Sequence, residues 1–498
     1  AIRDVVVPAA KLEAEGHDIL KLNIGDPLAY PGLPTPDHMI EAYHKSLINQ
    51  QNGYSPAYGI SELREAIAED ENNKHNGGWN CASDDVYICH GVTEALQIIF
   101  ATFLNKDDEV LAPGPHYPPY MAYPQLFGGK TVEYRLDPDN DWSIDFEDLE
   151  SKMNDKVKLL VLINPNNPTG NVINKEEIDK IIDLTSKWSN CTIISDEIYD
   201  RLNFNGNHFS TASRSTNVPV ITLNGVSKVY YAPGWRIGYM ALHDPTNKLS
   251  DIKDGLERLL RSRLCASTPA QYGYLAGLKG DDSWMQDYLL TVRKHNDLCL
   301  EHINTIDGIS VQSPQGAFYM FVRITHDYWK DRDKEFVLKL LHDKHVLLVH
   351  GSGFSKEYGK GHFRMVFLPS EKILSEGNIQ LTSVQRKKMV KLKRRQIIQH
   401  IQSNAIDPKS KTPHPLTRIE LALDESRFSV DPFKKLDSQI KDAIKLLKPL
   451  IPLSFENTRL AFKITGKHYG SVSQLLRQYK EKEEWLSNGQ WVCVIEIP

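Results

Sequence analysis

The sequence predicts an α/β protein in which a large three-layer domain with a mainly parallel sheet precedes smaller domains. Three observations support this fold class. Between residues 84 and 270, short β-branched runs alternate with helical stretches. Residues 283–367 combine a long amphipathic helix with further strand patterns, and from Leu381 onward long helices replace the alternation. With 498 residues, the chain is long enough for roughly three domains.

Six runs in the first region fit strands, and most of them lead through turn residues into a helix pattern. They are Val86–Cys89, Val110–Ala112, Leu159–Ile163, Thr192–Ser195, Val220–Leu223 and Tyr239–Leu242. This alternation predicts a parallel sheet with crossover helices. The next region predicts a small α+β domain with helices over 283–306 and Lys334–His345 and strands over Phe318–Val322, Val346–Val349 and Phe363–Phe367.

The C-terminal part predicts a helical bundle followed by a short α+β unit. Three helices, over Ser383–Ser403, Leu416–Arg427 and Asp431–Leu447, are joined by short connections, which indicates a small three-helix bundle. A strand, a helix and a strand then follow over Thr458–Ile464, Ser471–Tyr479 and Trp491–Ile497.

The net charge of −5 conceals two parts of opposite sign. Residues 381–498 hold 22 basic and 12 acidic side chains, whereas residues 1–380 hold 37 and 52. Such a split suggests two different partners. The six cysteines are dispersed without a C-x-x-C pair, and no apolar run approaches the roughly 18 residues of a membrane span. We therefore expect a reduced, cytoplasmic protein with no membrane partner.

A candidate phosphate site lies where the first strand runs into a helix. After Val86–Cys89 come Gly91, Val92 and Thr93, so that backbone N–H groups and the Thr93 hydroxyl face outward at the strand's end. A helix start of this kind binds phosphate. A plain strand–turn–helix corner explains the same pattern at least as well.

Two further strands end in polar residues. Leu159–Ile163 leads into a loop containing Asn167, and two X-Pro steps fix this loop and aim its asparagine side chains. Thr192–Ser195 delivers Asp196 and Tyr199, and α/β sheets place ligand contacts at the carboxyl ends of their strands. A rigid turn and a solvated strand end are the respective alternatives.

A lysine follows the strand Val220–Leu223. It stands in Asn224-Gly225-Val226-Ser227-Lys228, and the cationic Arg236 follows in Gly234-Trp235-Arg236. A lysine beside another cation can have a lowered pKa and act as a Schiff-base nucleophile. An ordinary surface lysine fits this loop alone about as well.

In this order and spacing, these segments resemble the class I aminotransferases of the fold-type I pyridoxal phosphate enzymes. The resemblance spans about residues 1–370 and, within the family, looks greatest to the alanine and aspartate transaminases of archaea and bacteria. It also includes Gly25 in Asn23-Ile24-Gly25-Asp26-Pro27, Tyr54, Tyr117 in Pro115-His116-Tyr117-Pro118, and Arg364 in Phe363-Arg364-Met365. It implies a large domain with a mainly parallel seven-stranded sheet, and a small α+β domain.

The resemblance implies pyridoxal 5′-phosphate as the cofactor and assigns the catalytic roles. Lys228 attaches the cofactor as a Schiff base and then shuttles a proton. Asp196 pairs with the pyridine nitrogen and keeps it protonated. Asn167 and Tyr199 hydrogen-bond the O3′ atom of the ring, and Tyr117 stacks on it.

The remaining implied roles are binding roles. The substrate α-carboxylate binds Arg364, with help from Asn167 and the backbone of Gly25. Five residues of the same chain hold the phosphate: Gly91, Val92, Thr93, Ser227 and Arg236. A sixth, Tyr54, comes from the second subunit of a homodimer.

The expected reaction is therefore a ping-pong transfer of the amino group of an α-amino acid to a 2-oxo acid such as 2-oxoglutarate. The sequence offers no clear second arginine for a dicarboxylate side chain, which favours alanine over aspartate as the donor. A lyase or decarboxylase of the same cofactor family is a further alternative. His342, His345 and His350 do not complete a plausible ligand set, so we expect no metal.

The C-terminal part contains five distinctive segments: Gly377–Thr382, Asn404–Pro408, Pro413–Pro415, Arg418–Glu420 and Trp491–Cys493. In these segments it resembles a second family, the SBDS ribosome maturation proteins. This resemblance covers about residues 371–498 and implies a three-helix domain, a partial ferredoxin-like domain and contact with rRNA of the large ribosomal subunit. Taken alone, the charge of the basic helix 383–403 favours a solvated face over a nucleic-acid contact.

The two resemblances predict five segments: an N-terminal segment of the small domain (1–30), a cofactor-binding large domain (31–275), the aminotransferase small domain (276–370), an SBDS-like three-helix domain (371–450) and a partial ferredoxin-like domain (451–498). Two alternatives stay open. The chain is a ribosome biogenesis factor with an inert aminotransferase fold, or it is a composite of two separate proteins. A single native species with the mass of the whole chain would exclude the composite.

Overall fold

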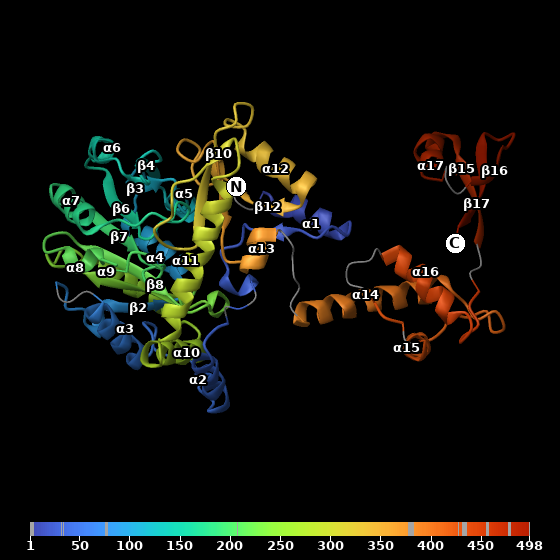
Figure 1. Cartoon of the computed structure of the whole chain (residues 1–498), viewed down its shortest axis with the longest axis horizontal. Helices are drawn as coiled ribbons and strands as arrows, with labels where there is room; N and C mark the ends of the chain where they lie inside the picture. The colour runs from blue at the N-terminus through green and yellow to red at the C-terminus, as the bar shows by residue number, and fades with distance from the viewer. Residues whose placement is uncertain are drawn as a thin grey trace. The chain divides into compact units, whose positions relative to one another are not determined.

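A computed structural model describes residues 4–30, 32, 34–74, 78–206, 208–376, 383–426, 428–430, 436–454, 458–476 and 480–497. The chain divides into two compact units, residues 1–379 and 380–498 (Figure 1). The expected motif Gly377–Thr382 lies outside the described residues, as do Arg427, 431–435 and 477–479 of the expected helices.

An eight-stranded sheet forms the centre of the first unit, in the order β2-β9-β8-β7-β6-β3-β4-β5. Strands β4, β3, β6, β7 and β8 are mutually parallel, and β9 runs antiparallel between β8 and β2. This mainly parallel sheet confirms the predicted fold class, with the short β5 added to the seven expected strands. The bounds are β2 Val86–Cys89, β3 Glu109–Gly114, β4 Lys130–Asp137, β5 Ser143–Ile144, β6 Val157–Ile163, β7 Thr192–Asp196, β8 Val220–Gly225 and β9 Gly238–His243.

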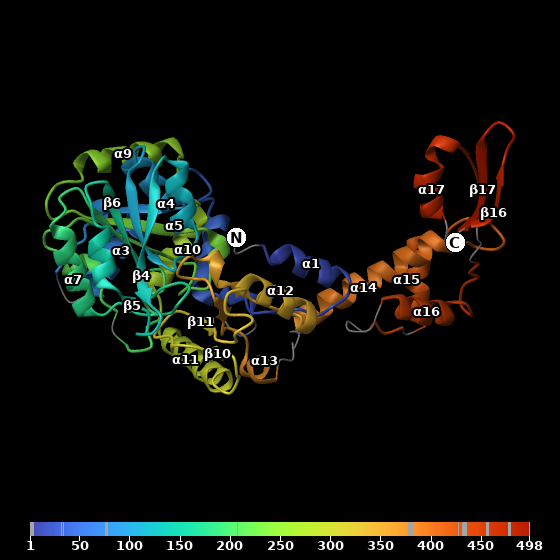
Figure 2. The ribbon, with the colours of Figure 1, turned by 90° about the horizontal axis from the view of Figure 1, so that it is seen from above.

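Helices cover both faces of this sheet (Figure 2). In β6, Leu159 and Val161 pack into one apolar cluster and Leu160 and Leu162 into another, because successive side chains of a strand point to opposite faces. A strand buried on both faces is a continuous apolar run, which is why the sequence pattern located it. The first cluster includes α4 (Val92–Phe103), α5 (Pro119–Leu126) and α9 (Ser250–Ser262), and the second α6 (Phe146–Lys152), α7 (Lys175–Ser186) and α8 (Thr211–Arg214).

A four-stranded antiparallel sheet, in the order β10-β11-β14-β13, forms the smaller part of this unit. Its strands are β10 (Ile309–Ser310), β11 (Tyr319–Ile324), β13 (Val349–His350) and β14 (His362–Val366). The single strand expected over Val346–Val349 is in fact two, since β12 (Val346–Leu347) pairs in parallel with β1 (Leu20–Lys21). The remaining helices are α1 Val6–Ala14, α2 Asp37–Ile48, α3 Ser61–Asn73, α10 Thr268–Lys279, α11 Trp284–Ile303, α12 Asp333–Lys344 and α13 Glu371–Glu376.

The second unit contains the three predicted helices, α14 (Ser383–Asn404), α15 (Leu416–Glu425) and α16 (Leu436–Leu447), around a shared apolar core. Next come β15 (Thr458–Thr465), α17 (Tyr469–Leu476), β16 (Lys480–Trp485) and β17 (Gln490–Ile497), with strand order β15-β17-β16. The sequence pattern missed β16 because all its residues are exposed and most are charged. Within the described residues, no helix combines the length and apolar character that crossing a bilayer requires.

Candidate active site

Five loops of the first unit meet at one edge of the large sheet. Strands β2, β3, β6, β7 and β8 all point the same way, so the segments after them converge at their carboxyl ends. Together with residues 23–26 and with Tyr319 and Arg364 of the smaller sheet, they line a cavity of about 450 Å³. The predicted site residues that line it are Gly25, Val92, Thr93, Tyr117, Asn167, Asp196, Tyr199, Ser227, Lys228, Arg236 and Arg364.

The start of α4 has the features of an anion site. Its N-cap, Gly91, has φ +74°, a conformation that favours glycine. A Cβ atom there would lie 2.6 Å from the Nη2 atom of Arg236, so the glycine also makes room for the guanidinium. The N–H groups at a helix start, together with an arginine, suit a phosphate better than a plain corner does.

Lys228 lies at the wall of this cavity, where its Nζ donates a hydrogen bond of 2.7 Å to the carbonyl oxygen of Gly25. Burial, with the positive charge of Arg364 nearby, lowers the pKa of Lys228 to about 8. The amine is thus much more readily neutral than that of an exposed lysine. This environment favours the nucleophile over the surface-lysine interpretation.

The carboxylate of Asp196 is buried at the end of β7. Tyr120, on α5, donates a hydrogen bond of 2.7 Å to its Oδ2 atom. Burial raises the pKa of Asp196 to about 6, and the bond from Tyr120 opposes that rise. Sequence reasoning missed Tyr120, although its spacing of one helical turn from Tyr117 was a usable signal.

Arg364 is buried on β14, with its guanidinium held in a fixed orientation. Its Nη1 donates to Oδ1 of Asn167 at 2.8 Å and its Nη2 to the carbonyl oxygen of Asn23 at 2.7 Å. Among the described residues, no acceptor meets its buried Nε. A buried donor without a partner indicates a ligand acceptor, and a carboxylate matches the guanidinium geometry.

Tyr319 is a second cavity residue that sequence reasoning missed. Its hydroxyl lies 2.9 Å from that of Tyr199. It also explains Gly25, because a Cβ on Gly25 would lie 2.1 Å from the Tyr319 oxygen. Tyr319 belongs to the apolar run of β11, where its sequence context indicates only a core strand residue.

Two predicted residues do not line the cavity. Gly91 acts at the helix start as described above. The side chain of Tyr54 is 85 % exposed and lies outside the cavity of its own chain. The expectation that Tyr54 serves a second subunit therefore stays a prediction.

Comparison with known proteins identifies two families along the chain. Residues 17–375 match the model for aminotransferase class I and II, and residues 395–456 match that for SBDS protein, domain II. The glutamate-pyruvate aminotransferase AlaA of Haemophilus influenzae is 37% identical over 373 residues, covering 74% of this chain and 91% of that protein. The probable aspartate aminotransferase of Methanocaldococcus jannaschii is 33% identical over 351 residues, covering 70% and 89%. The structure of an alanine aminotransferase from Pyrococcus furiosus superposes with a TM-score of 0.73 and 47% identity, over 76% of this chain and 94% of that one.

Proposed function

The chain belongs to the class I and II aminotransferases, and we propose that it transfers the amino group of alanine to a 2-oxo acid such as 2-oxoglutarate. The observation that carries this proposal is that Arg364, a carboxylate receptor, and Lys228, a readily deprotonated amine, line one cavity. Alanine as donor is supported by the relatives named glutamate-pyruvate and alanine aminotransferases. It is also the donor whose methyl side chain needs no polar partner.

Class I aminotransferases depend on pyridoxal 5′-phosphate, which is therefore the cofactor of this enzyme. The residues present fit it. Arg236 and the N–H groups at the start of α4 suit its phosphate, the Asp196 carboxylate its ring nitrogen, and the Lys228 amine its aldehyde. When bound, the cofactor supplies an electron sink for negative charge at the substrate Cα.

Side chains of this chain carry out the rest of the proposed mechanism. Arg364 binds the α-carboxylate and orients the substrate Cα toward Lys228. The neutral Lys228 amine takes the proton from the substrate Cα and would return it at the C4′ atom of the cofactor. Asp196 stays ionised opposite the ring nitrogen, and the hydroxyl of Tyr199 and the amide of Asn167 hold O3′. Amino donor and 2-oxo acceptor use this same site in turn, which gives ping-pong kinetics.

A panel of amino donors, each assayed with 2-oxoglutarate and with pyruvate, tests the proposed reaction. We expect alanine with 2-oxoglutarate to give the highest kcat/KM and parallel double-reciprocal lines. A preference for aspartate would instead support the aspartate transaminase alternative. A protein that binds pyridoxal phosphate yet transfers no amino group would indicate a lyase, a decarboxylase or an inert scaffold.

The pKa of Lys228 predicts how the cofactor-free protein takes up pyridoxal phosphate. Only a neutral amine attacks an aldehyde, so the uptake rate should rise with pH with a midpoint near pH 8, where half of the Lys228 amine is neutral. Stopped-flow absorbance at a series of pH values measures this. A midpoint near the ordinary lysine value of about 10.4 would contradict the environment described above.

Tyr120→Phe should weaken binding of pyridoxal phosphate at acidic pH. Without the Tyr120 hydroxyl, the pKa of Asp196 rises further above about 6, so the pH below which affinity is lost moves upward. Titrations of the cofactor-free protein at several pH values measure the shift. Tyr134→Phe is the matched control, because Tyr134 is equally buried but donates to the carbonyl oxygen of Val161, at 2.8 Å. An equal shift in both variants would rule out the role of Tyr120.

A homodimer with shared sites is part of the proposal. It is supported by the exposure of Tyr54 and of three apolar side chains on α2, Ile40, Leu47 and Ile48. In a dimer, Tyr54 reaches the phosphate of the partner's site. Light scattering should give twice the chain mass, and Tyr54→Phe should weaken cofactor binding without changing that mass.

We further propose that residues 371–498 contact rRNA of the large ribosomal subunit, because residues 395–456 match SBDS domain II. Exposed basic residues of this unit suit such a contact: Lys391, Arg395, Lys409, Arg418, Lys441, Lys445 and Lys448. Binding to large subunits should fall steeply with salt and disappear when residues 371–498 are deleted. Persistence after this deletion would contradict the proposal. Both functions suit the cytoplasm, as do the free thiols of the six cysteines.

A further inference from the structure

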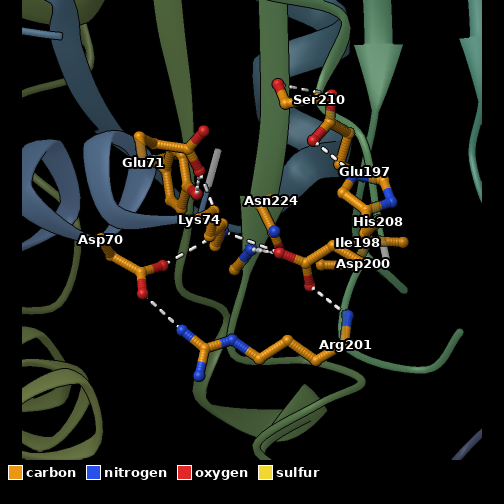
Figure 3. Close-up of polar contacts among 12 residues, drawn as sticks. Asp70, Glu71, Lys74, Glu197, Ile198, Asp200, Arg201, His208, Ser210 and Asn224 are labelled. Carbon is orange, nitrogen blue, oxygen red and sulfur yellow. Dashed lines mark hydrogen bonds and ion pairs between the residues drawn. The ribbon is translucent and has the colours of Figure 1, made fainter. Parts of the chain in front are cut away.

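A cluster of charged side chains lies directly behind the strand end that supplies Asp196. Glu71, Glu197 and Asp200 are buried in it, whereas Asp70, Lys74 and Arg201 are half-buried. We call it the ion-pair cluster, and Figure 3 shows its side chains pointing toward one another. The proposed mechanism uses none of its members. They comprise four carboxylates and three bases: Asp70, Glu71, Glu197, Asp200, Lys74, Arg201 and His208.

Lys74, at the C-terminal end of α3, connects the carboxylates of that helix with the carboxylate of Asp200, which follows β7. Its Nζ lies 3.1 Å from a carboxylate oxygen of Asp70 and 3.0 Å from one of Glu71, both on its own helix. It also lies 2.7 Å from Oδ2 of Asp200, which is far away in the sequence and only 3 % exposed. Although burial alone would raise the pKa of Asp200, Lys74 and Arg201 lower it to about 2. Lys74 thus binds an ionised aspartate in the protein interior.

Four further contacts hold Glu197 and Arg201, which belong to the same stretch of chain as Asp200. Arg201 pairs with Asp70. The fully buried Glu197 accepts hydrogen bonds from Ser195 at 2.8 Å and from Ser210 at 3.1 Å, and its other oxygen lies 2.8 Å from Nε2 of His208. Residues 197, 200 and 201 are therefore all anchored on one side of the chain.

The opposite side of this segment faces the cofactor cavity. Asp196, Ile198 and Tyr199 line the cavity, whereas Glu197, Asp200 and Arg201 enter the ion-pair cluster. Backbone bonds from Asp200 to Glu197, 2.9 Å, and from Leu202 to Tyr199, 2.8 Å, make residues 196–202 a tight turn. A single stretch of backbone, residues 196–202, therefore separates the ion-pair cluster from the cavity. Because the same backbone carries both sets of side chains, a backbone shift at Glu197, Asp200 or Arg201 also displaces Asp196 and Tyr199.

We propose that the ion-pair cluster positions Asp196 and Tyr199 for the cofactor, with Lys74 as its central positioning residue. The inference rests on the proposed function, because it assigns a purpose to the turn only if pyridoxal phosphate binds there. The physical basis is that breaking a buried ion pair leaves an uncompensated charge, which the structure relieves by moving or by admitting water. A displacement of about 1 Å at a binding constellation is enough to impair it strongly.

The test compares cofactor affinity in variants of the full chain, freed of cofactor and titrated with pyridoxal phosphate by visible absorbance. We expect Lys74→Met to raise the Kd about tenfold or more, equivalent to about 1.4 kcal/mol, and the cationic Lys74→Arg to restore most of the affinity. Asp200→Asn should weaken binding in the same direction. Asparagine has nearly the same shape as aspartate, and the change removes one of four carboxylates. If Lys74→Met does not fold, Asp200→Asn therefore tests the positioning role.

Arg64→Met is the matched control for a general loss of stability. Arg64 lies on the same helix as Asp70 and Glu71, and its side-chain exposure is 14% against 13% for Lys74. It contacts Asp84 and the carbonyl oxygen of Val86 instead of the turn. This variant should lower Tm yet keep the parent's Kd for pyridoxal phosphate.

A second measurement is the pH dependence of the bound cofactor's visible absorbance, which should shift in Asp200→Asn and stay unchanged in Arg64→Met. Parent-like Kd and absorbance in Asp200→Asn, or equal weakening in Arg64→Met, would overturn the positioning role while leaving the proposed function intact. A parent protein that binds no pyridoxal phosphate would overturn both.

Discussion

Lys228→Ala is expected to lower kcat/KM for transamination by about 10⁴-fold or more, which is the upper range for losing a general acid–base group. The variant loses the amine that holds the cofactor and the base that moves the Cα proton. No other lysine is among the described residues lining the cavity, so none is placed to substitute. Steady-state assays with the best donor measure the loss, and visible absorbance shows whether the cofactor is still attached covalently.

Lys187→Ala is a suitable control for Lys228→Ala. Lys187 is exposed and its Nζ lies 3.1 Å from Glu150 at the surface. This variant should retain the parent's activity and absorbance. Loss of a general base leaves a residual rate well below about a hundredth of the parent's. If Lys228→Ala kept more than that fraction of the parent's kcat/KM, Lys228 would not be the base that moves the Cα proton.

The second large effect is expected for Asp196→Asn. The change keeps the shape of the side chain and an acceptor for Tyr120 but removes the negative charge that holds the ring nitrogen protonated. Loss of one partner from a buried charge pair costs about 2–5 kcal/mol, which corresponds to a fall of about 30- to 4,000-fold in kcat/KM. Transient kinetics should place this loss in the Cα proton-transfer step, since the electron sink is weakened there.

Asp179→Asn provides the comparison for Asp196→Asn. Asp179 pairs with Arg214, with both N–O distances 2.7 Å, and it lies away from the cavity. This variant should alter stability slightly and leave kcat/KM unchanged. Parent-like transamination in Asp196→Asn would refute the assigned pairing with the ring nitrogen.

Strands of the large sheet differ in how far the sequence revealed them. The pattern located β6 and β7 because residues of both faces are buried, and each strand contains adjacent apolar residues, Leu159–Ile163 in β6 and Ile193 and Ile194 in β7. It missed β4, which lies toward one edge of the sheet and is only partly buried. It also missed β16, whose residues are all exposed. An edge strand is defined by its backbone pairing, which leaves little trace in local composition.

The candidate site shows the same division. Thr93, Asn167, Asp196 and Lys228 each follow a predicted strand, and parallel strands bring such residues to one edge of the sheet. The contact between the Tyr199 and Tyr319 hydroxyls joins residues 120 positions apart. Neither local pattern nor spacing encodes that pairing.

By itself, the sequence determined the α/β class, the strand ends that carry chemistry, the two family resemblances and the cofactor. Only the tertiary structure decided that Lys228 has a lowered pKa, that Tyr120 supports Asp196, and that an ion-pair cluster stands behind the 196–202 turn. The physical reason is that periodicity and turn chemistry act between near neighbours in the chain. Desolvation and charge interaction depend on which distant residues pack together, and that is settled only when the sheet and its helices assemble.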